Sequence, residues 1–214
     1  MADSVIGVID YRAGNAQSVV YALDRLGIAC RKMSDPSELE QVERVVLPGV
    51  GSAGATLESL HEDGWVEPLR QRVLTDKMPY LGICVGLQVL FEHSEEDDAE
   101  CLGWLRGQVK KFDSRAVRVP QIGWNQVQPR SAHPFVEGLR AGGYYYFVNS
   151  YHAVPADPGQ VGATTEYGLD FCSVVAHENI MATQFHVEKS ATLGLELLGH
   201  FSRLSRTDLC SPSA

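Results

Sequence analysis

Cys84 is the residue whose surroundings most clearly favour chemistry. It lies in Leu81-Gly82-Ile83-Cys84-Val85-Gly86-Leu87-Gln88, with a glycine two positions to either side. An apolar run precedes it and helix-forming residues follow it, which predicts a strand, a sharp turn and a helix. The nucleophile elbow G-x-S-x-G has this layout, with serine in place of cysteine. Glycines suit such a turn because a Cβ would block the close approach of strand to helix. A thiol at a helix start also feels the positive end of the helix dipole, which favours the thiolate.

A histidine and a carboxylate form a candidate base for this thiol. His186 and Glu188 stand in the segment Phe185-His186-Val187-Glu188, which is predicted to close the last strand. Alternate residues of a strand point to the same side, so the two side chains are expected to share a face. Glu188 could then hold the imidazole in one tautomer and stabilise its protonated form. The alternatives are a buried structural cysteine and a surface His-Glu pair.

A glycine-rich loop, Pro48-Gly49-Val50-Gly51-Ser52-Ala53-Gly54, follows a predicted strand at 44–47. It lacks the lysine and the spacing of the phosphate-binding loop G-x-x-x-x-G-K-[ST]. It is either a flexible turn or a set of backbone N–H groups that face an anion or a developing oxyanion. Ligand sites in open parallel sheets lie at the carboxyl ends of the strands, where the cysteine, the loop and the histidine are all expected.

The elements that must position these residues alternate between strand and helix in the first half of the chain. Strands are expected at 5–9, 28–33, 44–47 and 79–83, and helices at 16–26, 55–60, 65–74 and 85–91, with a further short helix that starts at 34–36. Gly27 fits the position that ends the first helix, and Gly64 fits a break between two helical pieces. This alternation predicts an α/β fold with a parallel sheet and helices on both faces.

The second half of the chain contains short β-rich segments separated by turns. They are expected at 107–112, 116–119, 123–128, 144–151, 161–166, 171–175 and 180–184. This pattern favours an antiparallel extension of the same sheet, so one domain is expected over residues 1–214. A last helix is predicted at 192–204, and residues 205–214 are expected to fray.

Composition excludes several classes of protein. The chain has 214 residues and a formal net charge of −9, with no basic stripe, which argues against nucleic acid or an anionic membrane as a partner. The five cysteines are an odd number without CxxC or zinc-ligand spacing, which favours a reducing compartment and predicts no metal or other cofactor. We see no signal peptide or membrane-spanning segment, so a cytoplasmic location is expected.

Taken together, the motifs resemble a known family. PGVG, GICVGLQ and FHVEKS, in this order along the chain, are similar to the class I (triad) glutamine amidotransferases. DYRAGN, PQIGWNQV and YYYFVNSYHAV narrow the resemblance to the glutaminase subunits of imidazole glycerol phosphate synthases, over about residues 5–201. The resemblance implies a flavodoxin-like α/β fold and the hydrolysis of L-glutamine to glutamate and ammonia. It also implies a heterodimer in which ammonia passes through a channel to a (β/α)₈-barrel cyclase subunit, which makes imidazole glycerol phosphate and aminoimidazole carboxamide ribotide.

The resemblance implies a role for each candidate residue. The catalytic residues are the nucleophile Cys84, the acid-base His186 and its orienting partner Glu188. The oxyanion is expected to bind backbone N–H groups of Val85, Gly49, Val50 and Gly51. Glutamine is expected to contact Gln88, Glu96 and the backbone of Ser150 and Tyr151. Glu96 lies in the acidic run 92–100, which without the resemblance would be interpreted as a solvated loop. The partner interface and ammonia gate are expected at Asn15, Gln121, Ile122 and Trp124.

Four positions depart from the family pattern. Gln121 and Asn149 stand where histidine is usual, Val187 replaces a proline, and Arg12 stands where glycine is commoner. None belongs to the triad, so the departures bear on the client synthase rather than on glutamine hydrolysis. The alternatives are a paralogous glutaminase that supplies another synthase, for example in amidinated-sugar synthesis, a non-enzymatic relative, or another cysteine hydrolase such as a peptidase.

Overall fold

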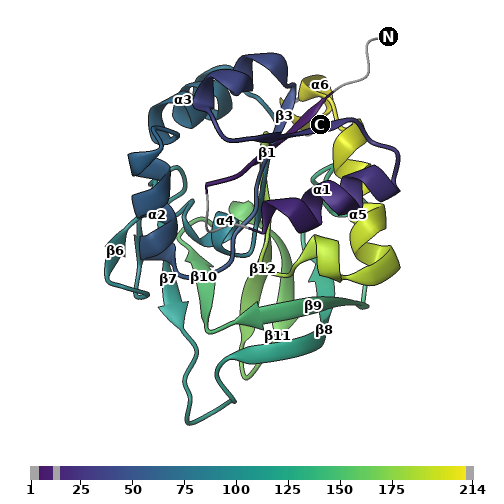
Figure 1. Ribbon diagram of the computed structural model, residues 1–214. Coiled ribbons are helices and arrows are strands. Elements are labelled where there is room, and N and C mark those ends of the chain that lie inside the picture. Colours follow the sequence, from purple (N-terminus) through teal and green to yellow (C-terminus); the bar gives the residue numbers. More distant parts are fainter. Residues whose placement is uncertain (1–4, 12–14, 211–214) are drawn as a thin grey trace.

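The computed structural model describes residues 5–11 and 15–210 (Figure 1). The α-helices are α1 (Ala16–Arg25), α2 (Ala53–Glu62), α3 (Val66–Arg70), α4 (Val85–Gln88), α5 (Ala191–Arg203) and α6 (Arg206–Cys210). Tighter or wider helical turns are η1 (Pro36–Gln41), η2 (Gln71–Thr75), η3 (Val136–Gly138), η4 (Pro158–Gln160) and η5 (Val187–Lys189). The strands are β1 (Ile6–Ile9), β2 (Cys30–Met33), β3 (Arg44–Leu47), β4 (Tyr80–Ile83), β5 (His93–Ser94), β6 (Ala99–Glu100), β7 (Gly107–Lys111), β8 (Gln121–Pro129), β9 (Gly143–Asn149), β10 (Tyr151–Pro155), β11 (Val161–Glu166), β12 (Asp170–His177) and β13 (Ile180–Thr183).

The parallel part of the sheet contains the strands that carry the candidate residues. Strands β2, β1, β3, β4 and β13 lie side by side in that order, and each neighbouring pair is parallel. Strands β1, β3 and β4 are buried along their whole length, as their continuous apolar sequences predict. Helices α1 and α5 lie on one side of the sheet, and α2 and α3 lie on the other (Figure 1). The predicted α/β fold is confirmed.

The antiparallel extension is also confirmed. Strand β12 pairs antiparallel with β13, and the sheet continues through β10, β7, β5 and β6. A branch runs from β12 through β11 and β8 to β9. Two expected boundaries are wrong. Residues 116–119 are not a strand, since the N–H groups of Ala116 and Val117 donate to the backbone oxygen of Asp113, and the expected strand 144–151 is interrupted at Ser150.

The helix ends follow local chemistry more closely than hydrophobic spacing. Helix α1 ends as predicted, because Gly27 adopts φ +68° and donates to the oxygen of Asp24 at 2.9 Å. The helix expected at 85–91 covers only 85–88. The backbone oxygens of residues 89–91 instead accept hydrogen bonds from residues 102, 103 and 105, so the helix cannot continue.

Residues 206–210, part of the tail that is expected to fray, form helix α6. Ser205 and Asp208 exchange hydrogen bonds at the start of α6, and Leu209 is buried. Residues 211–214 lie outside the described residues, as does Arg12. Within residues 5–11 and 15–210, the helices are all too short or too polar to cross a membrane.

Candidate active site

Cys84 lies at the turn between β4 and α4, as predicted. Its backbone has φ +55° and ψ −105°, a strained conformation for a residue with a side chain. A Cβ on Gly82 would come within 2.2 Å of the oxygen of Gly86, and one on Gly86 within 2.1 Å of the oxygen of Leu47. The hydroxyl of Tyr80 donates to that oxygen of Gly86 at 2.8 Å. Both glycines therefore permit the close contact that holds Cys84 at the end of β4.

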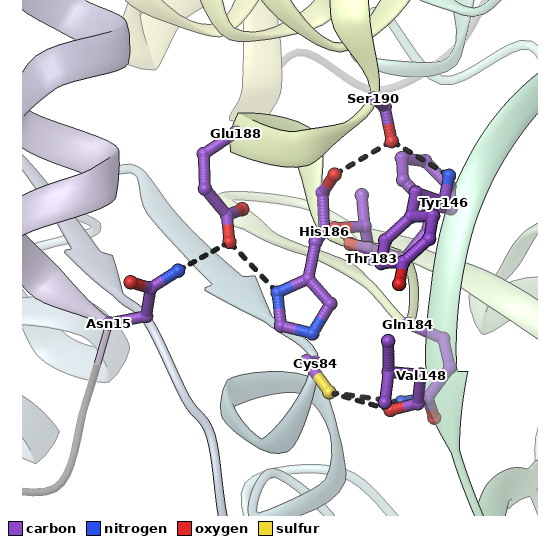
Figure 2. Close-up of polar contacts among 10 residues, drawn as sticks. Asn15, Cys84, Tyr146, Val148, Thr183, Gln184, His186, Glu188 and Ser190 are labelled. Carbon is purple, nitrogen blue, oxygen red and sulfur yellow. Dashed lines mark hydrogen bonds and ion pairs between the residues drawn. The ribbon is translucent and has the colours of Figure 1, made fainter. Parts of the chain in front are cut away.

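His186 and Glu188 meet, but for a different reason than the one predicted. Strand β13 ends at Thr183, and both residues lie beyond it, around the turn η5. His186 Nδ1 and Glu188 Oε1 are 2.8 Å apart (Figure 2). The prediction that the two share one face of a strand is therefore wrong, and a tight turn brings them together instead.

The turn that carries His186 is tied to strand β9. The hydroxyl of Ser190 donates to the oxygen of His186 at 2.7 Å and accepts from the N–H of Tyr146 at 2.9 Å (Figure 2). The N–H of His186 donates to the oxygen of Tyr146 at 2.9 Å. The ring of Phe185 packs against that of Tyr145, with centroids 4.4 Å apart. These contacts fix the backbone at His186 and thereby the position of its imidazole ring.

The environment of His186 favours its charged form. The side chain is buried, and burial by itself lowers the pKa. Hydrogen bonding and charge from Cys84 and Glu188 act in the opposite direction and raise the pKa of His186 to about 9. The second ring nitrogen faces Cys84 (Figure 2). An imidazolium beside the sulfur is the arrangement that stabilises a cysteine thiolate.

Gln184 is a further neighbour of the sulfur and is not among the predicted site residues. Its Nε2 lies 3.7 Å from Cys84 Sγ, and its Oε1 accepts from Gln88 Nε2 at 3.2 Å. Cys84 Sγ in turn lies 3.9 Å from the oxygen of Val148. The available sequence signal is that Gln184 begins the motif QFHVEKS, two residues before His186.

A cavity of about 250 Å³ opens at Cys84. It is lined by Gly51, Cys84, Val85, Gln88, Glu96, Pro120, Val148, Asn149, Ser150 and Tyr151. Neither Gly49 nor Val50 is a lining residue, but Gly49 packs on Val85, where a Cβ would come within 2.7 Å of the Val85 side chain. In the part of the chain that the structure describes, no group of three or more His, Cys, Asp or Glu side chains could hold a metal ion.

Two polar side chains line this cavity. Gln88 is buried, and its Nε2 also donates to the oxygen of Tyr151 at 3.2 Å. Glu96 accepts from the N–H of Ala53, the first residue of α2, at 3.0 Å. Partial burial raises the pKa of Glu96, and the bond from Ala53 only partly offsets that effect. A cation in the cavity would therefore relieve the cost of the Glu96 charge.

The residues predicted for a partner interface fall into three environments. Ile122 and Trp124 are 62% and 48% exposed on β8, and Tyr144 on the neighbouring strand β9 is 54% exposed. Gln121 is only 3% exposed, because alternate residues of β8 point to opposite faces. Gln121 therefore faces away from the exposed surface that carries Ile122, and its role at the interface or gate stays a prediction. The side chain of Asn15 lies against the triad, with Nδ2 2.8 Å from Glu188 Oε1.

Comparison with known proteins matches most of the chain to one family. Residues 7–201 match the family model described as "Glutamine amidotransferase class-I". "Imidazole glycerol phosphate synthase subunit HisH" of Dehalococcoides mccartyi is 45% identical over 205 residues, covering 95% of this chain and 99% of the relative. "Imidazole glycerol phosphate synthase subunit HisH 2" of Pseudomonas aeruginosa is 38% identical over 201 residues, covering 94% and 100%.

Solved structures show the same fold at lower identity. A chain described as "Crystal structure of glutamine amidotransferase" has a TM-score of 0.74 at 23% identity, covering 92% of this chain and 97% of its own. "Structure of PurLQS from Thermotoga maritima" has a TM-score of 0.73 at 16% identity, covering 93% and 97%.

Proposed function

The chain belongs to the class I glutamine amidotransferases, and we propose that it is the glutaminase subunit of an imidazole glycerol phosphate synthase. One observation carries the chemistry: a strained cysteine opens into a cavity that Gln88 and Glu96 also line, and faces a histidine that is held by a buried carboxylate. The names of the relatives, at 38% to 45% identity over most of the chain, support this choice of synthase.

The first step is attack of the Cys84 thiolate on the amide carbon of glutamine. The carbon–nitrogen bond breaks, a thioester forms on Sγ, and the leaving nitrogen takes a proton from the His186 imidazolium to depart as ammonia. Because the pKa of His186 is raised to about 9, its ring carries that proton at neutral pH. The neutral imidazole then removes a proton from water as the water attacks the thioester, and glutamate and the thiolate are released.

The oxyanion of both tetrahedral intermediates is assigned to backbone N–H groups. Val85 follows Cys84 at the start of α4, and both Val85 and Gly51 line the cavity. Gly49 packs so closely on Val85 that only a glycine fits there. N–H groups that are already positioned need little reorganisation when the negative charge develops.

Glutamine fits the remaining polar groups of the cavity. Glu96 is assigned to the substrate ammonium, because its carboxylate is half-buried. Ala53 donates to Oε2 only, so Oε1 is assigned to the ammonium. The backbone at Ser150, where β9 breaks before β10, is assigned to the substrate carboxylate together with Tyr151. Gln88 is assigned to the substrate side chain.

Ammonia is assigned to leave toward β8 and β9, where the partner cyclase docks. The exposed side chains of Ile122, Trp124 and Tyr144 form an apolar surface on these strands, and Pro120 and Asn149 connect the same strands to the cavity. The relatives' names indicate a partner subunit, and the sequence resemblance implies that this partner is a (β/α)₈-barrel cyclase in a heterodimer. We place the heterodimer in the cytoplasm. The proposal requires no cofactor.

The test combines the purified chain with its cognate cyclase and the ribotide substrate of that cyclase, and measures glutamate and imidazole glycerol phosphate together. We expect equal amounts of the two products. Cys84→Ala should abolish synthesis from glutamine and retain synthesis from added ammonium salt, which controls for the fold and the docking of the subunit.

Each contrary outcome identifies a different error. Glutamine hydrolysis by Cys84→Ala would show that another residue is the nucleophile. Glutamate without any cyclised product would retain the glutaminase but point to a different client synthase. Peptide hydrolysis without a response to glutamine would favour a peptidase instead.

A further inference from the structure

Asn15 occupies the N-cap position of α1, yet its side chain does not cap that helix. Asparagine is among the best N-cap residues, because its side-chain oxygen accepts a bond from the first free N–H groups of a helix. Ser52 makes this kind of bond at the start of α2, to Ala55 at 3.4 Å, and Asp35 does so at η1. Asn15 instead has φ −86° and ψ 39°, away from the extended conformation of those two caps.

The side chain of Asn15 is directed toward the candidate triad. Its Nδ2 donates to Glu188 Oε1 at 2.8 Å, and the same oxygen lies 2.8 Å from His186 Nδ1 (Figure 2). The Glu188 side chain is 1% exposed, and its other oxygen, Oε2, has no hydrogen-bond partner among the described residues. Two donors therefore converge on one oxygen of a buried carboxylate.

This convergence determines which carboxylate oxygen faces the histidine. A buried carboxylate held by one donor alone can turn about its terminal bond and exchange its two oxygens. A second donor, fixed to the first turn of α1, defines one orientation at Oε1. The bond from Asn15 also takes up part of the negative charge that Glu188 presents to His186.

We propose that Asn15 is a positioning residue for glutamine hydrolysis, which holds Glu188 so that Oε1 faces His186. This inference rests on the proposed glutaminase function. Helix α1 has no side-chain cap from Asn15, because the Asn15 side chain donates to the carboxylate of Glu188 instead. The position of α1 is thereby coupled to the orientation of Glu188 and, through it, to His186. Asn15 and Glu188 are 173 positions apart in the sequence.

Asn15→Asp gives the sharpest test, because aspartate has the same shape and caps helices as well as asparagine but offers no N–H donor when ionised. Asn15→Ser keeps a good cap residue and is too short to replace the contact. Gln17→Ala, at an exposed position of the same helix, is the matched control. Each variant is purified and assayed for glutamine hydrolysis with the cyclase and its ligand present, and its melting temperature is measured.

We expect kcat to fall at least about 10-fold in both Asn15 variants, with KM within about threefold of wild type. The melting temperature should stay unchanged in Asn15→Ser and should fall in Asn15→Asp, where two carboxylates face each other. Gln17→Ala should match wild type throughout. A kcat within twofold of wild type in both Asn15 variants would overturn the proposal. So would a loss of activity in Asn15→Ser that follows a fall in the melting temperature of that variant.

A second readout does not depend on glutamine. NMR titration of the His186 ring in the intact chain should show its midpoint displaced upward in Asn15→Asp, because a second carboxylate joins Glu188, and unchanged in Gln17→Ala. An unchanged midpoint in Asn15→Asp would contradict the contact itself. If the wild-type protein hydrolysed no glutamine while this displacement was present, the proposed function would fail and the positioning of Glu188 would stand.

Discussion

Gln121 and Asn149 lie directly opposite each other across the antiparallel strands β8 and β9. They are the two positions at which the sequence has an amide where histidine is usual in the family it resembles. Both side chains are buried, at 3% and 6% exposure, and each has a side-chain oxygen without a hydrogen-bond partner among the described residues. Asn149 Nδ2 donates to the oxygen of Tyr151 at 3.0 Å. The two departures therefore form one local change beside the cavity.

This pairing predicts that substitutions at the two positions are not independent. Directly opposed residues of an antiparallel pair interact, so restoring one histidine alone should crowd or desolvate the remaining amide. We expect the single variants Gln121→His and Asn149→His and the double variant to show a coupling in the free energy of unfolding of about 0.5–1 kcal/mol. Urea unfolding of the four proteins measures it. Gln126→His combined with Asn149→His is the control, since Gln126 is exposed and pairs with Tyr144. Additivity of both pairs to within about 0.3 kcal/mol would contradict the coupling.

Helix α5 offers a matched pair of glycines for testing how the His186 turn is supported. A Cβ on Gly194 would come within 2.0 Å of the oxygen of Val187, in the turn between His186 and Glu188, whereas a Cβ on Gly199 meets nothing closer than 3.6 Å. Gly194→Ala should lower the free energy of unfolding by about 1–3 kcal/mol and reduce glutamine hydrolysis. Gly199→Ala should keep full activity and match or exceed wild-type stability by up to about 1 kcal/mol. Equal behaviour of the two variants in denaturation and activity assays would show that the turn does not depend on this close contact.

The pKa of His186 predicts a pH dependence of stability. Its folded value of about 9 lies above the ordinary value of 6.5, so the folded state holds the proton more tightly than the unfolded state. The contribution to stability is then complete below pH 6.5 and is lost as the pH rises through about 9, at no more than about 1.4 kcal/mol per pH unit.

Urea unfolding between pH 6 and pH 9.5 tests this dependence. The wild-type free energy of unfolding should fall more steeply over this range than that of His186→Gln, which has no titrating ring. Parallel curves for the two proteins would mean that His186 does not titrate with the raised pKa.

The exposed apolar surface on β8 and β9 predicts where the partner subunit binds. Ile122→Asp should weaken binding of the cyclase at least about 10-fold, because a charge at a contact centre must be desolvated without a partner. Val154→Asp, at a 38% exposed position of β10, is the control and should bind normally. Titration calorimetry measures the affinities, and melting temperatures confirm that both variants fold. Wild-type affinity in Ile122→Asp would move the interface to another surface.

The parts of the fold that could be predicted are those with a local physical cause. Gly27 ends α1 through a positive φ, and Gly82 and Gly86 allow the turn at Cys84, since both effects arise within a few residues. The length of α4 could not be predicted, because its end is set by hydrogen bonds from residues 102–105 to the backbone of residues 89–91. The apolar spacing that suggested a longer helix contains no information about that competing segment.

The sequence by itself determined the order of strands and helices, the turn at Cys84 and the presence of His186 and Glu188 near the end of the last strand. Only the tertiary structure decided how these residues meet. Glu188 reaches His186 through a turn rather than along a strand, Asn15 bonds Glu188 instead of capping its helix, and Gln184 lies beside the sulfur. The reason is physical: contacts between residues about 100 or more positions apart depend on how helices pack on the sheet and on which residues pair between strands. Neither of these is encoded in a short run of sequence.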